Sequence, residues 1–342
     1  MSARLTHCRD PYWFGGSGFA LSPPLNAAAQ TWTISTDTPA GTGGYSGPKP
    51  AIQKSGSIYA ASAAAEPNGS VLVSTDSGST WTAESVPSTY SSVFAVCNVG
   101  GRVLAFCEDY AYTQGAPWTP YNSTKFYVSP LSVFVSAQMQ VAYGAGICVL
   151  FTGNSKIYYR STDGGLTWSS YDLPFPSPAS TEPSLLWDGT QFVAIIETSD
   201  SAIEQIATST DGLTWEQVAL SSTPSGLEML SAGGGIYAAA TATEVLIADS
   251  VAGLQSASLV DPFPGKDIAS IAVLADGRVI LELTDGTMHT SANVGKTWVS
   301  DTVAWSAFSA TQGPISPLGN LALASVSYTS GNGAWGQRTE LC

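Results

Sequence analysis

The sequence predicts an all-β protein, a β-propeller of about eight four-stranded blades, from three observations. The composition, with 34 Gly, 20 Pro and only 11% charged residues, suits many short strands joined by turns. A tryptophan recurs in similar surroundings about every 43 residues, and a period of 40–50 residues is typical of propeller blades. Three short apolar runs precede each of these tryptophans, and no window shows a capped helical period.

The repeat centres on the pattern S-x-D-x-G-x-T-W. It is complete at Ser74–Trp81 and Ser161–Trp168, one residue short at Ser209–Trp215, and carries Asn293 in place of the aspartate before Trp298. Looser copies end at Trp32, Trp118 and Trp335, and a decayed copy without its tryptophan falls at 245–260. Seven of the ten tryptophans therefore share one structural position.

These copies divide the chain into repeating units of a single domain. The expected blades are 1–40, 41–88, 89–122, 123–173, 174–220, 221–260, 261–303 and 304–342. Residues 1–40 form the weakest unit, and the alternative is seven blades with this segment as an arm or a closing strand. Because a closed ring has no internal boundary, residues 1–342 are expected to form one domain.

Each motif copy can be interpreted as a turn. The aspartate accepts hydrogen bonds from backbone N–H groups ahead of it, glycine takes the positive φ, and the threonine hydroxyl closes the loop. Burial of the tryptophan at the start of the next strand contributes about 2–3 kcal/mol. The residues assigned to this structural role are Ser74, Asp76, Gly78, Trp81, Ser161, Asp163, Gly165, Trp168, Asp211, Trp215, Asn293 and Trp298.

The complete copies resemble Asp-boxes, the repeats of bacterial neuraminidases and of many other propellers. In those families the box lies on the turn between the third and outermost strands, away from the active centre, so the resemblance implies a structural role for Asp76, Asp163 and Asp211. The box occurs in sialidases, other glycosidases, sorting receptors, assembly factors and phage proteins, and does not fix an activity. The runs VAYGAGICVLFTG and WDGTQFVAIIETS are similar to the non-catalytic propellers of phage tails and bacterial surface proteins.

Charge and hydropathy limit the classes of partner that the chain can have. A net charge of −14 with only 12 Lys and Arg argues against nucleic acid, because phosphate binding needs clustered cations. The first residues lack a secretory signal pattern, and the longest apolar runs are far shorter than the roughly 20 residues that span a membrane. We therefore expect no membrane insertion and a virion component made in the host cytoplasm, or alternatively a protein at the bacterial surface or secreted by a non-Sec route.

The five cysteines form no C-x-x-C pair. Counting outward from the Gly100–Gly101 turn places Cys97 opposite Leu104 and Cys107 opposite Phe94, so the strand register opposes a disulfide between the two cysteines. Buried free thiols are expected, as in a protein folded in a reducing cytoplasm.

Catalytic candidates are few. A sialidase needs three arginines that bind a carboxylate, but the chain has six in all, two of them beside turns or a motif strand, and no early Arg-Ile-Pro motif. Other glycosidases need two carboxylates about 5–9.5 Å apart, and Glu108, Glu197 and Glu282 fall near the ends of second strands in different units. The two histidines and the cysteine spacing predict no metal site and no Ser-His-Asp triad, and no cofactor is expected.

Three tryptophans fall outside the motif position, namely Trp13, Trp187 and Trp305, and could stack on a sugar or a partner protein. The sequence favours a non-enzymatic propeller of a phage tail or capsid within a larger assembly, with other virion proteins or a host-surface glycan as its partner. The alternatives are a glycoside hydrolase of the sialidase-like propeller type and a propeller that resembles the photosystem assembly factors.

Overall fold

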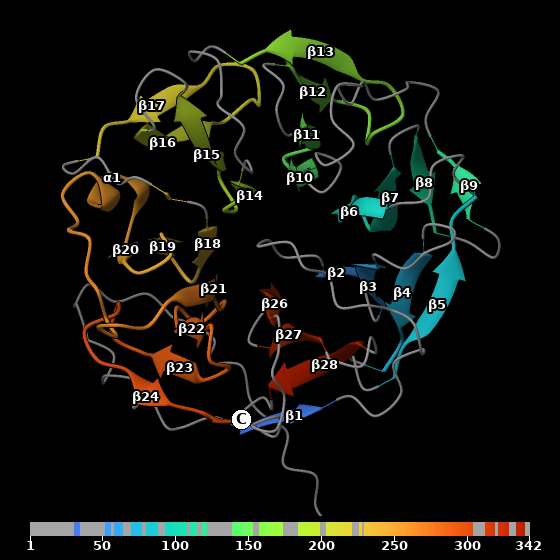
Figure 1. Ribbon diagram of the computed structural model, residues 1–342. Helices are drawn as coiled ribbons and strands as arrows, with labels where there is room; N and C mark the ends of the chain where they lie inside the picture. The colour runs from blue at the N-terminus through green and yellow to red at the C-terminus, as the bar shows by residue number, and fades with distance from the viewer. Residues whose placement is uncertain are drawn as a thin grey trace, which may run out of the picture.

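The structure is a computed structural model of the 342-residue chain. It describes residues 31–34, 52–55, 58–63, 70–76, 80–87, 93–107, 110–114, 118–121, 139–152, 157–173, 184–198, 203–220, 226–227, 229–303, 312–318, 321–327 and 333–338. These residues form seven sheets arranged around a central axis, as a β-propeller, and all strand pairs are antiparallel except the pair of β1 and β25 (Figure 1).

Blades 1 to 4 each contain four strands in chain order from the axis outward. Blade 1 comprises β2 (Ile52–Ser55), β3 (Ile58–Ala63), β4 (Ser70–Ser74) and β5 (Thr82–Ser85). Blade 2 comprises β6 (Val93–Val99), β7 (Arg102–Cys107), β8 (Ala111–Thr113) and β9 (Thr119–Pro120). Blade 3 comprises β10 (Met139–Gly144), β11 (Ile147–Thr152), β12 (Ile157–Ser161) and β13 (Ser169–Asp172). Blade 4 comprises β14 (Ser184–Trp187), β15 (Phe192–Thr198), β16 (Ile203–Ser209) and β17 (Glu216–Val218).

Blades 5 and 6 complete the regular part of the ring. Blade 5 has three strands, β18 (Met229–Gly233), β19 (Ile236–Ala240) and β20 (Val245–Ala248), followed by the short helix α1 (Val251–Leu254). Its fourth strand is reduced to an isolated bridge between Val245 and Val260, which agrees with the decayed repeat in this region. Blade 6 comprises β21 (Ile268–Val273), β22 (Val279–Leu283), β23 (Met288–Ser291) and β24 (Val299–Ser300).

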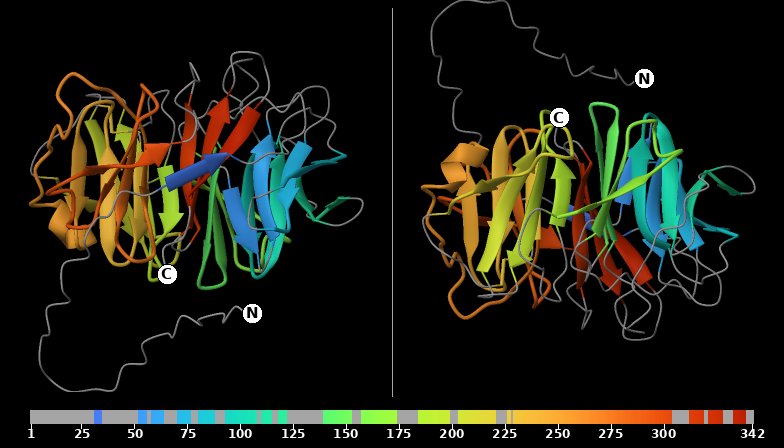
Figure 2. Two further views of the ribbon diagram at one scale, coloured as in Figure 1. Left: turned by 90° about the horizontal axis from the view of Figure 1, so that it is seen from below. Right: turned by 90° about the horizontal axis from the view of Figure 1, so that it is seen from above.

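Blade 7 closes the ring with strands from both ends of the described chain. It comprises β26 (Gln312–Leu318), β27 (Leu321–Ser327) and β28 (Gly333–Arg338). β1 (Thr31–Ile34) pairs antiparallel with β28 and parallel with β25 (Thr302–Val303), and lies across the outside of this blade (Figure 2). The eight-blade count is therefore wrong for the described residues, because Trp32 lies on a closing strand of blade 7, as in the seven-blade alternative.

Burial follows the distance of each strand from the rim. All five residues of β22 are buried, as are five of the six in β7, whereas β5 and β13 are mostly exposed. A strand covered on both faces by neighbouring sheets has no polar face, so these middle strands have nearly continuous apolar sequences. The inner strands of successive blades contact one another all the way round, including β2 with β26, so the ring is closed.

The cores lie between the blades. The cluster between blades 2 and 3 contains Cys97, Leu104 and Phe106 from one blade and Cys148 and Leu150 from the other. Equivalent clusters join blades 1 and 2, blades 3 and 4, blades 4 and 5, and blades 5 and 6. Each blade is therefore stabilised mainly by apolar burial against its neighbours rather than within its own sheet.

The cysteine register agrees with the prediction at one position and differs at the other. Cys97 is opposite Leu104 as expected, whereas Cys107 pairs with Val93 because the register shifts between Val93 and Ala95. Cys97, Cys107 and Cys148 are buried and not disulfide-bonded, and burial raises the pKa of the Cys97 thiol to about 12. Such thiols remain protonated and act as small apolar side chains. Among the described residues no helix is long and apolar enough to cross a membrane.

Candidate functional site

The turn between β12 and β13 shows how a complete motif is built. Asp163 accepts hydrogen bonds from the backbone N–H groups of Leu166 and Thr167 at 3.0 and 2.9 Å, and from the Thr167 hydroxyl at 2.5 Å. The Ser161 hydroxyl donates to the same carboxylate at 2.8 Å and accepts from the Gly165 N–H at 2.8 Å. Asp163 therefore serves its own loop, and the carboxylate is saturated by these local donors.

The other motif turns repeat this arrangement. Asp76 accepts from the Thr80 N–H at 2.9 Å and from the Thr80 hydroxyl at 2.6 Å. In the shortened copy, Asp211 accepts from the N–H groups of the second and third residues after it, at 2.8 and 2.7 Å. Asn293 uses its Oδ1 and Nδ2 atoms for the corresponding threonine N–H and hydroxyl, at 2.9 and 2.8 Å. An amide thus replaces the carboxylate, so the turn needs the hydrogen bonds more than the charge. Gly78 lies outside the described residues.

The three aspartates remain ionised through these contacts. Hydrogen bonds from Thr80 lower the pKa of Asp76, and the N–H of Thr214 lowers that of Asp211. Burial would raise the pKa of Asp163, but the bonds from Thr167 and Ser161 outweigh it and lower the pKa. A carboxyl whose pKa is lowered by local hydrogen-bond donors is ionised at neutral pH and is a poor proton donor, so these aspartates are unsuited to act as general acids.

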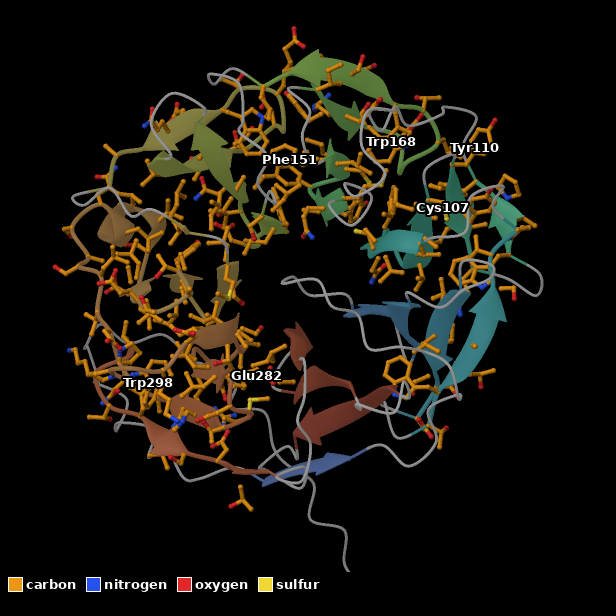
Figure 3. All side chains as sticks on the ribbon, in the orientation of Figure 1. Cys107, Tyr110, Phe151, Trp168, Glu282 and Trp298 are labelled. Carbon is orange, nitrogen blue, oxygen red and sulfur yellow. The ribbon has the colours of Figure 1, made fainter. Side chains whose placement is uncertain are left out.

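Tryptophans of three motif copies contact the preceding blade. Trp168 of blade 3, labelled in Figure 3, meets Phe106 of blade 2 edge to face with ring centroids 5.9 Å apart. Its Nε1–H donates to the Gly165 carbonyl at 2.9 Å. Trp215 of blade 4 lies 5.4 Å from the Phe151 ring of blade 3. Trp118 of blade 2 donates from Nε1 to Glu84 of blade 1 at 2.7 Å. The motif therefore joins neighbouring blades as well as starting its own outer strand.

The motif glycines make the same inter-blade contact. A Cβ added at Gly212 would lie 2.6 Å from Cγ2 of Val149 in blade 3, and one added at Gly295 would lie 2.6 Å from Cδ1 of Ile247 in blade 5. Both glycines also have positive φ, of 64° and 76°. The sequence predicts only the positive φ, whereas the close approach to the preceding blade depends on the assembled ring.

The three candidate carboxylates are not brought together as a described catalytic pair. Glu108 lies outside the described residues. Glu197 is on β15, with its Cα opposite that of Glu204, and only its backbone is described. Glu282 is fully buried in β22, where neither carboxylate oxygen has a hydrogen-bond partner. Glu282 lies one residue before the end of β22, near the strand end as expected, but the whole strand is buried and the carboxyl is not accessible.

The tryptophans outside the motif do not provide a described stacking platform. Trp13 and Trp305 lie outside the described residues. Trp187 packs between blades 3 and 4, since a Cβ added at Gly144 would lie only 1.9 Å from Cδ2 of its ring, and it meets Phe192 at 4.8 Å between centroids. This ring is partly buried and packs against the core between these two blades.

Asp188, the residue after Trp187, makes an inter-blade contact that sequence reasoning missed. The Tyr237 hydroxyl of blade 5 donates to Asp188 of blade 4 at 2.7 Å. Burial would raise the pKa of Asp188, but this bond and those from Thr190 and Gln191 lower it. The Asp-Gly pair was a visible turn signal, whereas the partner 49 residues away was not.

The motif rim is the surface formed by the motif turns of blades 3 and 4, and it presents two exposed leucines. Leu166 and Leu213 occupy the same place in successive motif turns, and 46% and 42% of their surfaces are exposed. The turn of blade 4 is anchored on blade 3, because Arg160 donates from Nε to the Asp211 carbonyl at 2.7 Å. Both leucines therefore lie on rigid, hydrogen-bonded tips.

A cation borders the motif rim at blade 2. Arg102 lies over the Tyr121 ring, 5.8 Å from its centroid, and its guanidinium is within 3.5 Å of the Tyr121 hydroxyl. A Cβ added at Gly165 would lie 3.7 Å from Tyr121 Cε1, so the tyrosine adjoins the turn that carries Leu166. The rim therefore combines apolar, aromatic and cationic groups. Within the described ranges, no group of three or more His, Cys, Asp or Glu could hold a metal ion.

Comparison with known proteins supports the fold. No family model matches the chain, and no curated protein matches it. Among solved structures, YCF48 from Cyanidioschyzon merolae is 16% identical with a TM-score of 0.61, and the match covers 91% of this chain and 98% of that chain. YCF48 bound to D1 peptide is also 16% identical, with a TM-score of 0.62, and the match covers 93% of this chain and 98% of that chain.

Two further structures show the same architecture. BBS1N in complex with ARL6DN is 13% identical with a TM-score of 0.57, covering 91% of this chain and 97% of that chain. A GH74 enzyme from Niastella koreensis is 15% identical with a TM-score of 0.56, covering 84% of this chain but 43% of that chain. At these identities the likeness concerns the fold, and the chain is a β-propeller.

Proposed function

We propose that the chain is a non-enzymatic binding propeller, a structural or receptor-recognition component of a virion such as a phage tail or capsid, and that it contacts a partner protein. In this proposal the motif turns are Asp-boxes used as architecture. The observation that carries it is the motif rim, where Leu166 and Leu213 stand exposed at equivalent positions of neighbouring blades.

The rim suits protein contact because its groups are held in place before binding. Hydrogen bonds from the backbone fix the tips that carry Leu166 and Leu213, so little conformational entropy is lost when a partner covers them. Arg102 stacked near Tyr121 adds the residue types that are enriched in protein interfaces. Two exposed apolar tips on neighbouring blades, one of them bordered by an arginine and a tyrosine, offer a partner protein both apolar and polar contacts.

The similar structures support a protein partner over a glycan. YCF48 is recorded with the D1 peptide and BBS1N with ARL6DN, and both match nearly their full length to this chain. Glycan stacking would use exposed tryptophan rings, whereas Trp187 is packed between two blades. Contact with other virion proteins is therefore the leading proposal, and a host-surface glycan is the second outcome of the test.

The glycoside hydrolase alternative has support only from the fold shared with the GH74 enzyme. It needs two accessible carboxylates about 5–9.5 Å apart. Glu282 has no exposed surface and cannot reach a sugar, and the motif aspartates are saturated by their own turns. This alternative therefore depends on Glu108 and Glu197.

Mass spectrometry of purified virions and of the free protein fraction tests the proposal. We expect the chain to travel with the particle at a fixed copy number, and cross-links to join the motif rim to one other virion protein. The double variant Leu166→Ser/Leu213→Ser should lose at least tenfold in particle retention, yet keep its unfolding free energy within about 0.5 kcal/mol, since exposed side chains contribute little to stability.

A matched control separates the rim from general apolar exposure. Val260, 52% exposed at the edge of blade 5, is changed to Ser, and Val260→Ser should retain normal particle association. A chain found only at the bacterial surface or in the secreted fraction would contradict the virion assignment. Turnover on a glycan panel that is lost in Glu108→Gln or Glu197→Gln would instead establish the hydrolase.

A further inference from the structure

Glu282 is the only acidic or basic side chain among the buried residues that the structure describes. It has no exposed surface, and both of its carboxylate oxygens lack a hydrogen-bond partner. Burying an unpaired carboxylate costs far more than burying the neutral acid, so the side chain is retained in its protonated form. Desolvation accordingly raises the pKa of Glu282 well above its ordinary value.

The strand register shows which way the side chain faces. Leu281 and Leu283 belong to the core that blade 6 shares with blade 5. Side chains alternate along a strand, so Glu282 faces the opposite side, toward blade 7 (Figure 3). Its cross-strand neighbour Ser270 shares that face and accepts a hydrogen bond from the Ile315 N–H of β26 at 2.9 Å.

The same two blades are also joined on the outside of the ring. β25 runs on from blade 6 and pairs with β1, and the described residues pair as Thr31–Thr302 and Trp32–Val303. The seam between blades 6 and 7 thus combines a buried carboxyl without a hydrogen-bond partner with the pairing of β1 and β25 on the outside of the ring. It is also where the strand from the amino-terminal side closes the ring.

No described charge compensates Glu282. On β23, Met288 is opposite it, and His289 points to the other face and stacks on Phe263, with centroids 4.1 Å apart. Asp301, directly after β24, accepts a hydrogen bond from the Thr290 hydroxyl at 2.8 Å. The sequences of β21, β26 and β27 contain no ionisable side chain, and β28 contains only Arg338. Burial is the sole cause of the shift.

We propose that Glu282 makes the seam between blades 6 and 7 a proton-dependent closure, which holds while the carboxyl is protonated and opens more often as the pH rises. The sign follows from proton binding. The closed seam keeps a proton that the opened, hydrated carboxyl releases above its ordinary pKa of about 4.3. Between that pH and the raised pKa of the closed state, each pH unit increases the opening equilibrium constant about tenfold.

Hydrogen exchange of the full chain between pH 5 and 8, corrected for intrinsic exchange rates, tests this closure. In the parent protein, amides of β21, β22 and β26 should show an opening constant that rises about tenfold per pH unit, while those of β10 and β11 in blade 3 stay constant. In Glu282→Gln, which is neutral at every pH, the rise should disappear. Glu216→Gln, at an exposed strand position, should behave like the parent.

The neutral apolar variant Glu282→Met carries the same test if the glutamine variant does not fold. Flat exchange at the seam in either neutral variant, with the parent rising, supports the proposal. A parent whose seam amides show no pH dependence, or a neutral variant that keeps the rise, overturns it. If the opening constant rises equally in all seven blades, the proposal of a local opening at this seam is overturned, because the whole ring would then be opening.

Discussion

The tryptophan of the motif turn permits a matched comparison between blades 3 and 6. Trp168 donates from Nε1 to the Gly165 carbonyl at 2.9 Å, whereas the Nε1 of Trp298 is buried with no hydrogen-bond partner. The two motif copies have the same length. Changing each residue to Phe removes the ring nitrogen from both, but removes a hydrogen bond from only one.

The structure gives the size of the expected difference. Trp168→Phe loses a net hydrogen bond of about 0.5–1.5 kcal/mol and leaves the Gly165 carbonyl unsatisfied, so the polar loss is about 1–3 kcal/mol. Trp298→Phe relieves an unpaired buried N–H and should have no polar loss. Trp168→Ala, which also removes the contact with Phe106, should cost about 3–5 kcal/mol.

Urea unfolding followed by far-ultraviolet circular dichroism measures these free energies, because that signal does not depend on the tryptophan that is removed. The reasoning requires Trp168→Phe to destabilise the protein more than Trp298→Phe does. Equal losses in the two variants would show that the Gly165 bond contributes nothing, and a larger loss for Trp298→Phe would refute the assignment.

Three further changes test the contacts between blades. Gly144→Ala should destabilise the ring by about 1–3 kcal/mol or more, because the new Cβ would lie 1.9 Å from the Trp187 ring. Adding Trp187→Ala to the same chain should relieve part of this strain. Losses of unfolding free energy that simply add in the double-mutant cycle would contradict this contact. Tyr237→Phe should cost about 1.5–3 kcal/mol at neutral pH by removing the 2.7 Å bond to Asp188, and a melting temperature equal to that of the parent would disprove the role of this bond. Asp163→Asn should leave the protein folded at neutral pH and weaken the fall of its melting temperature at acid pH. The pKa of Asp163 is lowered in the folded state, so the stability that the carboxylate contributes is present above the ordinary pKa of about 3.9 and is lost as the pH falls through the folded pKa. A fall of the melting temperature at acid pH as steep as that of the parent would count against the turn assignment.

The repeat predicts the propeller architecture from the sequence, but it does not predict how the ring is closed. The motif spacing predicted blades of about the observed length, and the decayed copy at 245–260 agrees with the three-stranded blade 5. Trp32 ends a looser copy of the motif, so the sequence alone suggested a separate blade there, although the weakest of the eight. Only pairing with β28 and β25, which are far away in the chain, makes this strand part of blade 7.

The site residues were predictable where the interaction is local. The hydrogen bonds of Asp163 lie within four residues, and turn chemistry alone indicates them. The packing of Gly212 on Val149 and the bond from Tyr237 to Asp188 depend on neighbouring blades and leave no local pattern. Glu282 was interpreted as a strand-end acid, although its place within the apolar run VILEL was a signal of burial.

Cross-linking mass spectrometry of intact virions most directly tests whether this propeller is a non-enzymatic protein-binding component. The account predicts a fixed copy number per particle, cross-links from the motif rim to one virion protein, and loss of retention in Leu166→Ser/Leu213→Ser but not in Val260→Ser. A chain that is absent from particles, remains a free monomer and turns over a glycan would contradict it.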